Sequence, residues 1–124
     1  MKKWFAVSLL LAGCSHDFEL MKMEEQVSGY GAAIRWNQFK KAAGYLDPVQ
    51  SAPPDWKALD DIQITSYNIQ FRDVLPSGKV MMQTAEIHYI PAGSLVEKTL
   101  IDQQRWHQDE DSGRWMLESG LPQL

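Results

Sequence analysis

The sequence is poor in cysteine, since Cys14 is the only one among 124 residues. A lone cysteine excludes an internal disulfide, and a metal site built on it would need His, Cys or carboxylate ligands in a folded frame. The residues around Cys14 provide no such frame. Two roles remain for this thiol: covalent attachment, or burial as a small apolar side chain.

Several enzyme motifs are also missing. The chain contains no glycine-rich phosphate loop, no nucleophile elbow, no HExxH pair and no Cys-x-x-Cys, which counts against those particular mechanisms. Basic residues are few, with 12 Lys and Arg against 16 Asp and Glu and a net charge of −4. Nucleic acids and anionic lipid surfaces require clustered positive charge, so neither is an expected partner of the domain itself.

No apolar run is long enough to span a bilayer, which takes ~20 residues. The longest lies near the N-terminus at 4–11, preceded by Lys2 and Lys3 and followed by small residues just before Cys14. A positive start, a short apolar run and small residues are typical of a secretory signal segment.

Residues 11–14, Leu-Ala-Gly-Cys, resemble the lipobox of bacterial lipoproteins at all four positions. The resemblance implies a signal peptide at 1–13 and a lipid attachment site at Cys14, which becomes the acylated N-terminus. Ser15 resembles the pattern of lipoproteins sorted to the outer membrane and facing the periplasm. The alternative is an ordinary cleaved signal peptide with an incidental buried cysteine.

Acyl chains would be the membrane contact of such a protein. Each buried CH₂ contributes about 0.8 kcal/mol, and one chain alone binds only marginally. Several chains, as lipoproteins that resemble this one carry, give a permanent anchor. Cleavage after residue 13 leaves 111 residues and changes the net charge from −4 to −6. That length suits one domain, at 14–124, with a single core.

The first part of this domain is predicted to be helical. The stretch 23–34 has apolar residues spaced for one helix face: Met23, Val27, Tyr30 and Ile34. Asp17 is the predicted N-cap. Gly29 and Gly31 either weaken this helix or permit close packing.

A second, shorter helix is predicted after Asn37, which would cap it, and it ends at Asp47-Pro48. Its inner face consists of Phe39, Ala42, Ala43 and Leu46. A semi-rigid proline-rich connector follows at 48–56.

From Asp61 onward the periodicity is that of strands. Ile62 and Ile64 share one parity, whereas three later residues share the other: Tyr67, Ile69 and Phe71. A β-bulge near Thr65 would keep one face buried. Turn residues at 76–78, 91–93 and 110–113 separate further strands. The predicted fold is α+β, with two helices packed on about four antiparallel strands that pair with their neighbours.

Three segments give the domain a resemblance to the cystatin-like fold in its NTF2-like form, and to small proteobacterial lipoproteins of that shape. They are RWNQFKKAAGYLDP at 35–48, ITSYNI at 64–69 and QQRWHQDEDSGRWMLESGLP at 103–122. The resemblance implies a curved sheet that forms a cone with the helices, either open to a small ligand or plugged by side chains. Members of the superfamily include enzymes, ligand binders and assembly modules, so the fold does not determine the function.

Ketosteroid-isomerase-like members of that superfamily use a carboxylate in an apolar cavity beside a neutral donor. Candidates for these roles here are Asp47, Asp102, His88 and Tyr67. No spacing brings any two of them together. Asp47 is more simply a turn residue, and His88 a polar partner on a half-exposed strand.

Large aromatic side chains are numerous enough to dominate a core of this size. A subset would line the cone if it were open, and the candidate cavity-lining residues are Trp36, Tyr67, Tyr89, Trp106 and Trp115.

Two further patterns indicate structure more than metal binding. Residues 109–113 have the DxDxG spacing of a calcium loop, but residue 120, where a bidentate Glu is required, is Gly. The segment is predicted to be a turn, with Trp106 and Trp115 paired across it. Met81 and Met82 are adjacent on a strand and point to opposite faces, so they do not share an ion.

The sequence therefore predicts a lipid-anchored envelope protein that acts as a non-catalytic binding or assembly module. Its contacts would be the membrane, through acyl groups on Cys14, and an envelope protein complex docked on a sheet edge or on the exposed methionine. No catalytic residue, cofactor or metal is predicted. The alternative is a small-molecule binder or an NTF2-like enzyme that uses the cone.

Overall fold

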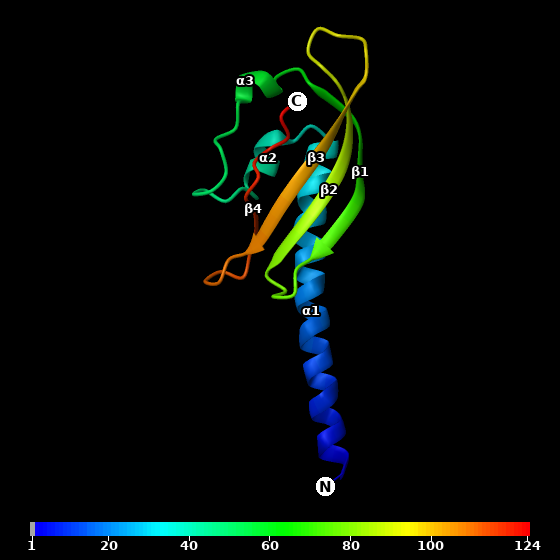
Figure 1. The fold of residues 1–124 in the computed structure, drawn as a ribbon, viewed down its shortest axis with the longest axis vertical. Coiled ribbons are helices and arrows are strands. Elements are labelled where there is room, and N and C mark those ends of the chain that lie inside the picture. Colours follow the sequence, from blue (N-terminus) through cyan, green and yellow to red (C-terminus); the bar gives the residue numbers. More distant parts are fainter. Residues whose placement is uncertain (1) are drawn as a thin grey trace.

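A computed structural model describes residues 2–124, with side chains described from residue 18 onward. Three helices and four strands follow one another along the chain: α1 (Lys2–Arg35), α2 (Phe39–Ala43), α3 (Trp56–Leu59), β1 (Gln63–Val74), β2 (Val80–Ile90), β3 (Lys98–Gln108) and β4 (Trp115–Leu117) (Figure 1). The helices pack against one antiparallel sheet of four strands. The α+β prediction is confirmed, and the arrangement is consistent with a cystatin-like or NTF2-like fold.

The strands pair in the order β1-β2-β3-β4, as the short turns predict. The ladder between β1 and β2 is irregular at two places, between Ile64 and Ser66 and between Ile69 and Phe71. The first irregularity confirms the predicted bulge. The second turns Phe71 to the outer face, opposite Thr84, so its predicted place beside Ile69 is wrong, because each bulge shifts the alternation by one residue. Ile69 stays on the inner face but is 42 % exposed, so its predicted burial is also wrong.

Helix α1 is the longest element. Its C-terminal half packs along the sheet, while its N-terminal half projects past the strands (Figure 1). The face predicted to be buried is buried: Met23, Val27, Tyr30 and Ile34. The predicted N-cap at Asp17 is wrong, because the helix already begins at Lys2. No proline between residues 2 and 17 interrupts it.

The predicted boundary at residue 13, and Cys14 itself, lie outside the residues whose side chains are described. Among the described residues, no helix combines the length and the apolar composition needed to cross a membrane.

The two glycines of α1 allow close packing without breaking the helix. A Cβ atom at Gly29 would lie 2.3 Å from the hydroxyl oxygen of Tyr45. One at Gly31 would lie 2.7 Å from Cε1 of Tyr67. Each glycine therefore makes room for a tyrosine ring against the helix backbone.

Asn37 joins α1 to β1. Its backbone has a φ of 60°, and its Oδ1 accepts a hydrogen bond of 2.7 Å from the backbone N–H of Ile64. The N-cap of α2 is Gln38, with no side-chain hydrogen bond. The predicted capping role of Asn37 is wrong because the residue takes the left-handed conformation that follows a helix C-terminus.

The connector contains a short helix that the sequence did not suggest. Asp55 caps α3 by accepting a 3.1 Å hydrogen bond from the backbone N–H of Ala58. At the other end of the chain, Leu121 and Leu124 pack against the core. The C-terminal tail is thus part of the domain.

Candidate functional site

A chain of hydrogen bonds crosses the inner face of the sheet, the face that packs against α1. At its centre the Gln104 amide nitrogen donates to the Tyr67 hydroxyl, at 2.9 Å, and to Oδ2 of Asp102, at 3.0 Å. The Gln104 oxygen accepts from Nε2 of Gln83, at 2.9 Å, and from Nε1 of Trp106, at 3.0 Å. Two of the predicted acid-base candidates, Tyr67 and Asp102, are therefore brought together.

The chain continues to the protein surface through Arg72. Its Nε donates to Oε1 of Gln83 at 2.8 Å, and its Nη1 pairs with Glu24 on α1. The network thus links the helix to three strands through satisfied polar groups, as buried polar networks require.

Burial controls the ionisation of this cluster. It raises the pKa of the Asp102 carboxyl, and the hydrogen bond from Gln104 opposes that shift. Burial also raises the pKa of Tyr67 to about 12. The pKa of Tyr30 lies well above its ordinary value, first because the ring is buried and then because of Asp102 and Tyr67. Both phenols are neutral at physiological pH.

Aromatic side chains fill the space between this face and the helices. Trp106 is fully buried and meets Tyr30 edge-on, with ring centroids 5.3 Å apart. Tyr45 completes the cluster, 6.4 Å from Trp106 and 6.1 Å from Tyr30. Edge-to-face contacts of this kind stabilise aromatic pairs beyond their buried area.

The five candidate cavity-lining residues lie in different places. Trp106 and Trp115 are buried in the core, and Tyr67 and Tyr89 are partly buried against it. Trp36 is 65 % exposed, with Arg35 stacked on its ring at 4.4 Å. Trp36 and Tyr67 share a shallow surface groove. Trp106 and Trp115 are not cross-strand partners, because Trp106 pairs with Leu117 and Trp115 with Gln108.

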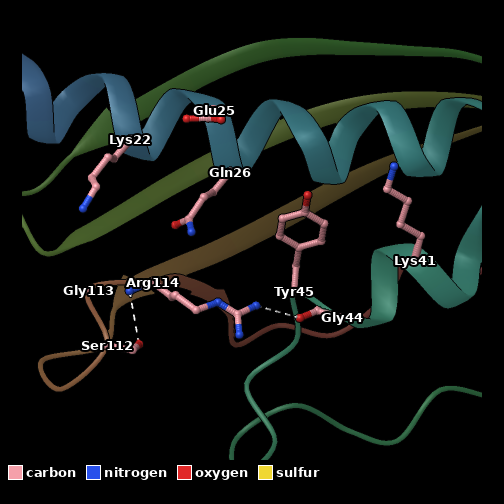
Figure 2. A pocket seen from close by; sticks show the side chains of 9 residues that line it. All are labelled: Lys22, Glu25, Gln26, Lys41, Gly44, Tyr45, Ser112, Gly113 and Arg114. Atoms are coloured by element: carbon pink, nitrogen blue, oxygen red, sulfur yellow. Dashed lines mark hydrogen bonds between the residues drawn. The ribbon is translucent and has the colours of Figure 1, made fainter.

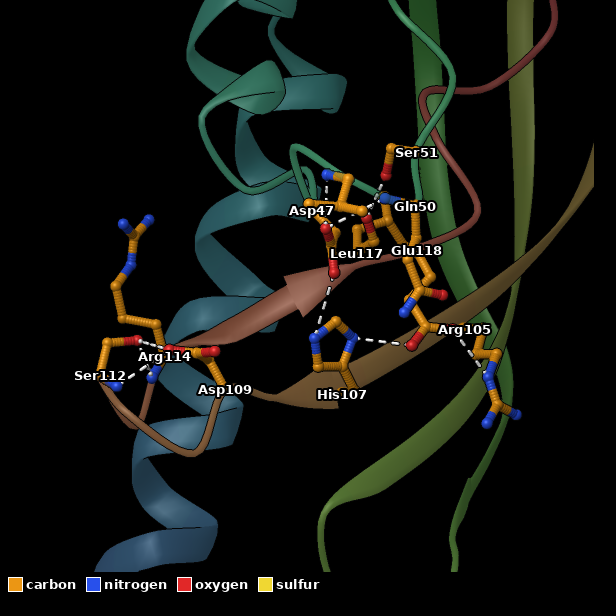
Figure 3. A network of polar contacts seen from close by, with 11 residues as sticks. Asp47, Gln50, Ser51, Arg105, His107, Asp109, Ser112, Arg114, Leu117 and Glu118 are labelled. Atoms are coloured by element: carbon orange, nitrogen blue, oxygen red, sulfur yellow. Dashed lines mark hydrogen bonds and ion pairs between the residues drawn. The ribbon is translucent and has the colours of Figure 1, made fainter.

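The other two acid-base candidates belong to outer-face networks. His88 lies between Glu86, at 3.6 Å, and Glu97, at 3.8 Å. Asp47 is only 7 % exposed, and its Oδ2 lies 3.2 Å from Nε2 of His107, whose Nδ1 lies 2.8 Å from Glu118 (Figure 3). No pattern in the sequence indicated that His107 would join the Asp47 turn to the sheet.

The His107 network is a structural contact and not a nucleophile-base pair. In a hydrolase triad the imidazole links a carboxylate to a hydroxyl, whereas His107 links two carboxylates. The nearby Ser51 hydroxyl donates to the backbone carbonyl of Leu117. Asp47 also accepts bonds from Val49 N, at 2.8 Å, and Gln50 N, at 3.1 Å, which confirms it as a turn residue.

The DxDxG segment forms the predicted turn. Asp109 accepts bonds from the backbone N–H and the hydroxyl of Ser112, at 2.9 and 2.7 Å, and these bonds lower the pKa of its carboxyl. Within the residues whose side chains are described, no three His, Cys, Asp or Glu side chains form a metal-binding group. Met81 is buried and Met82 is partly exposed on the opposite face, as predicted.

An open groove of about 510 Å³ lies between α1, the end of α2 and the turn before β4 (Figure 2). Lys22, Lys41 and Arg114 line it, and among the described lining residues Glu25 is the acidic one. Arg114 donates to the Gly44 carbonyl at 3.2 Å, and the side chain of Gln26 accepts from Trp115 N at 2.6 Å. The groove concentrates positive charge in a chain whose net charge is −4.

Comparison of the chain with protein-family models finds no match, and comparison with curated proteins finds none.

Sequence reasoning missed the residues that hold the inner network together. Gln83 and Gln104 are buried although both are polar. A signal was present, because Gln104 shares strand parity with Trp106 and Gln83 with Met81. Alternation therefore placed both amides on the core face.

Proposed function

We propose that the protein is a lipid-anchored recognition module of the bacterial cell envelope, held in the outer membrane by acyl groups on Cys14 and facing the periplasm. The domain recognises another protein through its surface and performs no chemistry. The observation that carries this proposal is the filled inner face. The positions where a cone-shaped cavity would receive a ligand are occupied by buried side chains, among them Trp106, Tyr30 and Gln104.

The course of α1 supports the anchoring part of the proposal. The helix runs without interruption through position 14 into the core residues Met23 and Val27. An acyl group at position 14 would be coupled to the domain by continuous helix rather than by a flexible tether. Phe18, Leu20 and Met21 are exposed within two turns of that position, where an apolar environment at the lipid boundary would suit them.

Replacement of Cys14 tests the anchor. Cys14→Ala is expected to move the protein from the membrane to the soluble fraction, since the acyl chains supply the attachment. Its thermal unfolding should match that of the wild type, because position 14 precedes Met23, the first core residue among those whose side chains are described. Ser15→Ala is the matched control. It should stay acylated, which its intact mass would report. A Cys14→Ala protein that remains wholly membrane-bound would contradict the anchor.

A second candidate is binding of an anionic small molecule, and the basic groove favours it. Lys22, Lys41 and Arg114 offer three cations with little opposing charge. Titration with inorganic phosphate, followed by NMR of the backbone amides of Ser112 and Gly113, tests this role. Saturable shifts that disappear in Arg114→Gln would support it, and shifts identical in that variant would exclude it.

A further inference from the structure

The N-terminal half of β3 has a free edge. β3 runs from Lys98 to Gln108, but β4 pairs with it only at residues 106–108 (Figure 1). Within the described residues, the last backbone group of β3 that the chain after β4 reaches is at Arg105. The carbonyl of Arg105 accepts from Glu118 N at 2.9 Å, and its N–H donates to the Ser119 hydroxyl at 3.2 Å. Residues 98–104 lie beyond this last contact.

The pattern of existing hydrogen bonds identifies the free backbone groups. The N–H of Gln108 donates to the Lys79 carbonyl, at 2.8 Å, on the β2 side. Arg105, three residues earlier, directs its groups to the β4 side. Since residues of an antiparallel strand alternate between the two sides, three more residues direct their N–H and C=O groups away from β2: Thr99, Ile101 and Gln103. Over the part of the chain that the structure describes, no backbone hydrogen bond from outside the β2–β3 ladder reaches them.

This edge is regular, unlike the opposite edge of the sheet. β1 carries two register shifts, and such bulges are a common means of preventing strand addition. The β2–β3 ladder runs without a shift from Val80 and His107 to Tyr89 and Lys98. The β3 edge therefore keeps the even spacing that an added strand needs.

The flanking side chains define what would complement the edge. On the outer face, Ile101 is 49 % exposed. On the inner face, the Asp102 carboxylate is partly buried and receives a hydrogen bond from Gln104 alone among the described side chains. An apolar side chain beside Ile101 and a cation beside Asp102 would satisfy both.

We propose that the free edge of β3 binds an extended segment of a partner protein by strand addition, with Lys or Arg beside Asp102 and an apolar residue beside Ile101. The backbone groups of Thr99, Ile101 and Gln103 supply the hydrogen bonds, and the two side chains supply the selectivity. This inference rests on the proposed function, for which it names the surface and the kind of partner.

A second copy of the chain does not suit this edge. Two identical edges pair antiparallel about a two-fold axis that crosses the sheet. Because α1 lies alongside the strands (Figure 1), the two copies would direct their N-termini in opposite directions. Chains anchored in one membrane at position 14 do not meet in that way, so the occupant is a different protein.

Fluorescence anisotropy with two labelled peptides tests the proposal on the full acylated protein in detergent micelles. Both peptides have seven residues that alternate Thr and Val, with a central Lys in one and Glu in the other. The Lys peptide is expected to bind about tenfold more tightly than the Glu peptide. Asp102→Asn should remove that preference while it leaves binding of the Glu peptide intact or stronger.

A proline variant tests the backbone contribution. Ile101→Pro removes an N–H that faces outward and spares the ladder with β2, so it should weaken the Lys peptide about tenfold. Ile101→Val keeps both the N–H and an apolar side chain, so the difference in affinity between the two variants measures the loss of the N–H. Circular dichroism establishes whether each variant is folded. If Ile101→Pro is unfolded, the loss of peptide preference in Asp102→Asn is the deciding test.

Three results would overturn the inference: equal binding of the two peptides, binding unchanged in folded Ile101→Pro, or a dimer in sedimentation that Ile101→Pro dissociates. The intact mass of the same sample reports acylation of Cys14 independently. Failure of the anchor and failure of the edge are therefore distinguishable.

Discussion

Asp102 and Gln104 differ in how well the fold satisfies them. The Gln104 amide uses both its oxygen and its nitrogen twice, with Gln83, Trp106, Tyr67 and Asp102 as partners. A buried amide whose oxygen and nitrogen both have hydrogen-bond partners costs the folded state little free energy. Asp102 is partly buried and, among the described side chains, only Gln104 donates a hydrogen bond to it, so burial disfavours its charged form.

Asp102→Asn is expected to stabilise the protein at neutral pH by about 1 kcal/mol. The raised pKa means that the folded state holds its proton more tightly than the unfolded state. The free energy of unfolding of the wild type therefore falls as the pH rises from about 4 through the raised pKa. Urea unfolding at several pH values should show the gain at pH 7 and its disappearance below pH 4. An equal stability difference between Asp102→Asn and the wild type at pH 7 and below pH 4 would contradict this prediction.

Gly31→Ala is expected to destabilise the domain by about 1–2 kcal/mol, although alanine normally strengthens a helix. The added Cβ would lie 2.7 Å from the ring of Tyr67, and that ring is held in place by the bond to Gln104. Ser28→Ala, at an exposed position of the same helix, is the control and should have little effect. Urea unfolding compares the two. A stabilised Gly31→Ala protein would mean that the ring moves freely.

At the scale of elements, single side chains fix how helices meet strands. The end of α1 is tied to the start of β1 by Asn37 and Ile64, and Arg35 Nη1 adds a 3.2 Å bond to the Ile64 carbonyl. On the outer face, His107 of β3 contacts Asp47 in its turn and Glu118, the residue that follows β4. These contacts join segments far apart in sequence, which is why local patterns did not indicate them.

Two variants at position 37 separate conformation from hydrogen bonding. Asn37→Gly keeps the positive φ and loses the bond to Ile64, at an expected cost of about 1 kcal/mol. Asn37→Ala also places a Cβ in the left-handed region and should cost about 1 kcal/mol more. Thermal unfolding of both, beside the exposed control Gln38→Ala, measures the difference. Equal losses would show that φ at this position is of no consequence.

At the scale of the whole molecule, the two ends of the chain have opposite roles. Helix α1 projects beyond the sheet on its N-terminal side (Figure 1), and cleavage after residue 13 would leave the proposed anchor, position 14, at the end of that projection. The C-terminal tail folds back onto the domain, with Pro122 buried and with Leu121 and Leu124 against the core. The loop between β2 and β3, which contains the 99 % exposed Leu95, lies at the end of the domain opposite the N-terminus (Figure 1). It is therefore far from the proposed anchor.

Deletion of residues 121–124 is expected to lower the free energy of unfolding by about 2–4 kcal/mol, because two leucines that pack against the core are removed. Gln123→Ala, at an exposed position, is the control and should match the wild type. Urea unfolding at neutral pH is the measurement. A truncated protein of unchanged stability would show that the tail is only an appendage.

Local sequence determined a large part of this protein. The periodicity of 23–34 fixed the buried face of α1, the turn residues fixed strand order, and the parity change at Thr65 fixed the first bulge, because each depends on neighbours within a few residues. The motif at Cys14 needs no fold to be recognised, and the anchor it predicts remains a prediction.

Tertiary structure decided the rest. The second bulge at Phe71, the left-handed Asn37, and the meeting of Tyr67 with Asp102 through Gln104 all depend on what packs opposite a residue. The short reach of β4 leaves part of β3 unpaired, and no local pattern in residues 98–104 reports the length of a strand elsewhere. Partners distant in sequence are brought together only when the chain buries its apolar surface, so these features became visible only in the folded molecule.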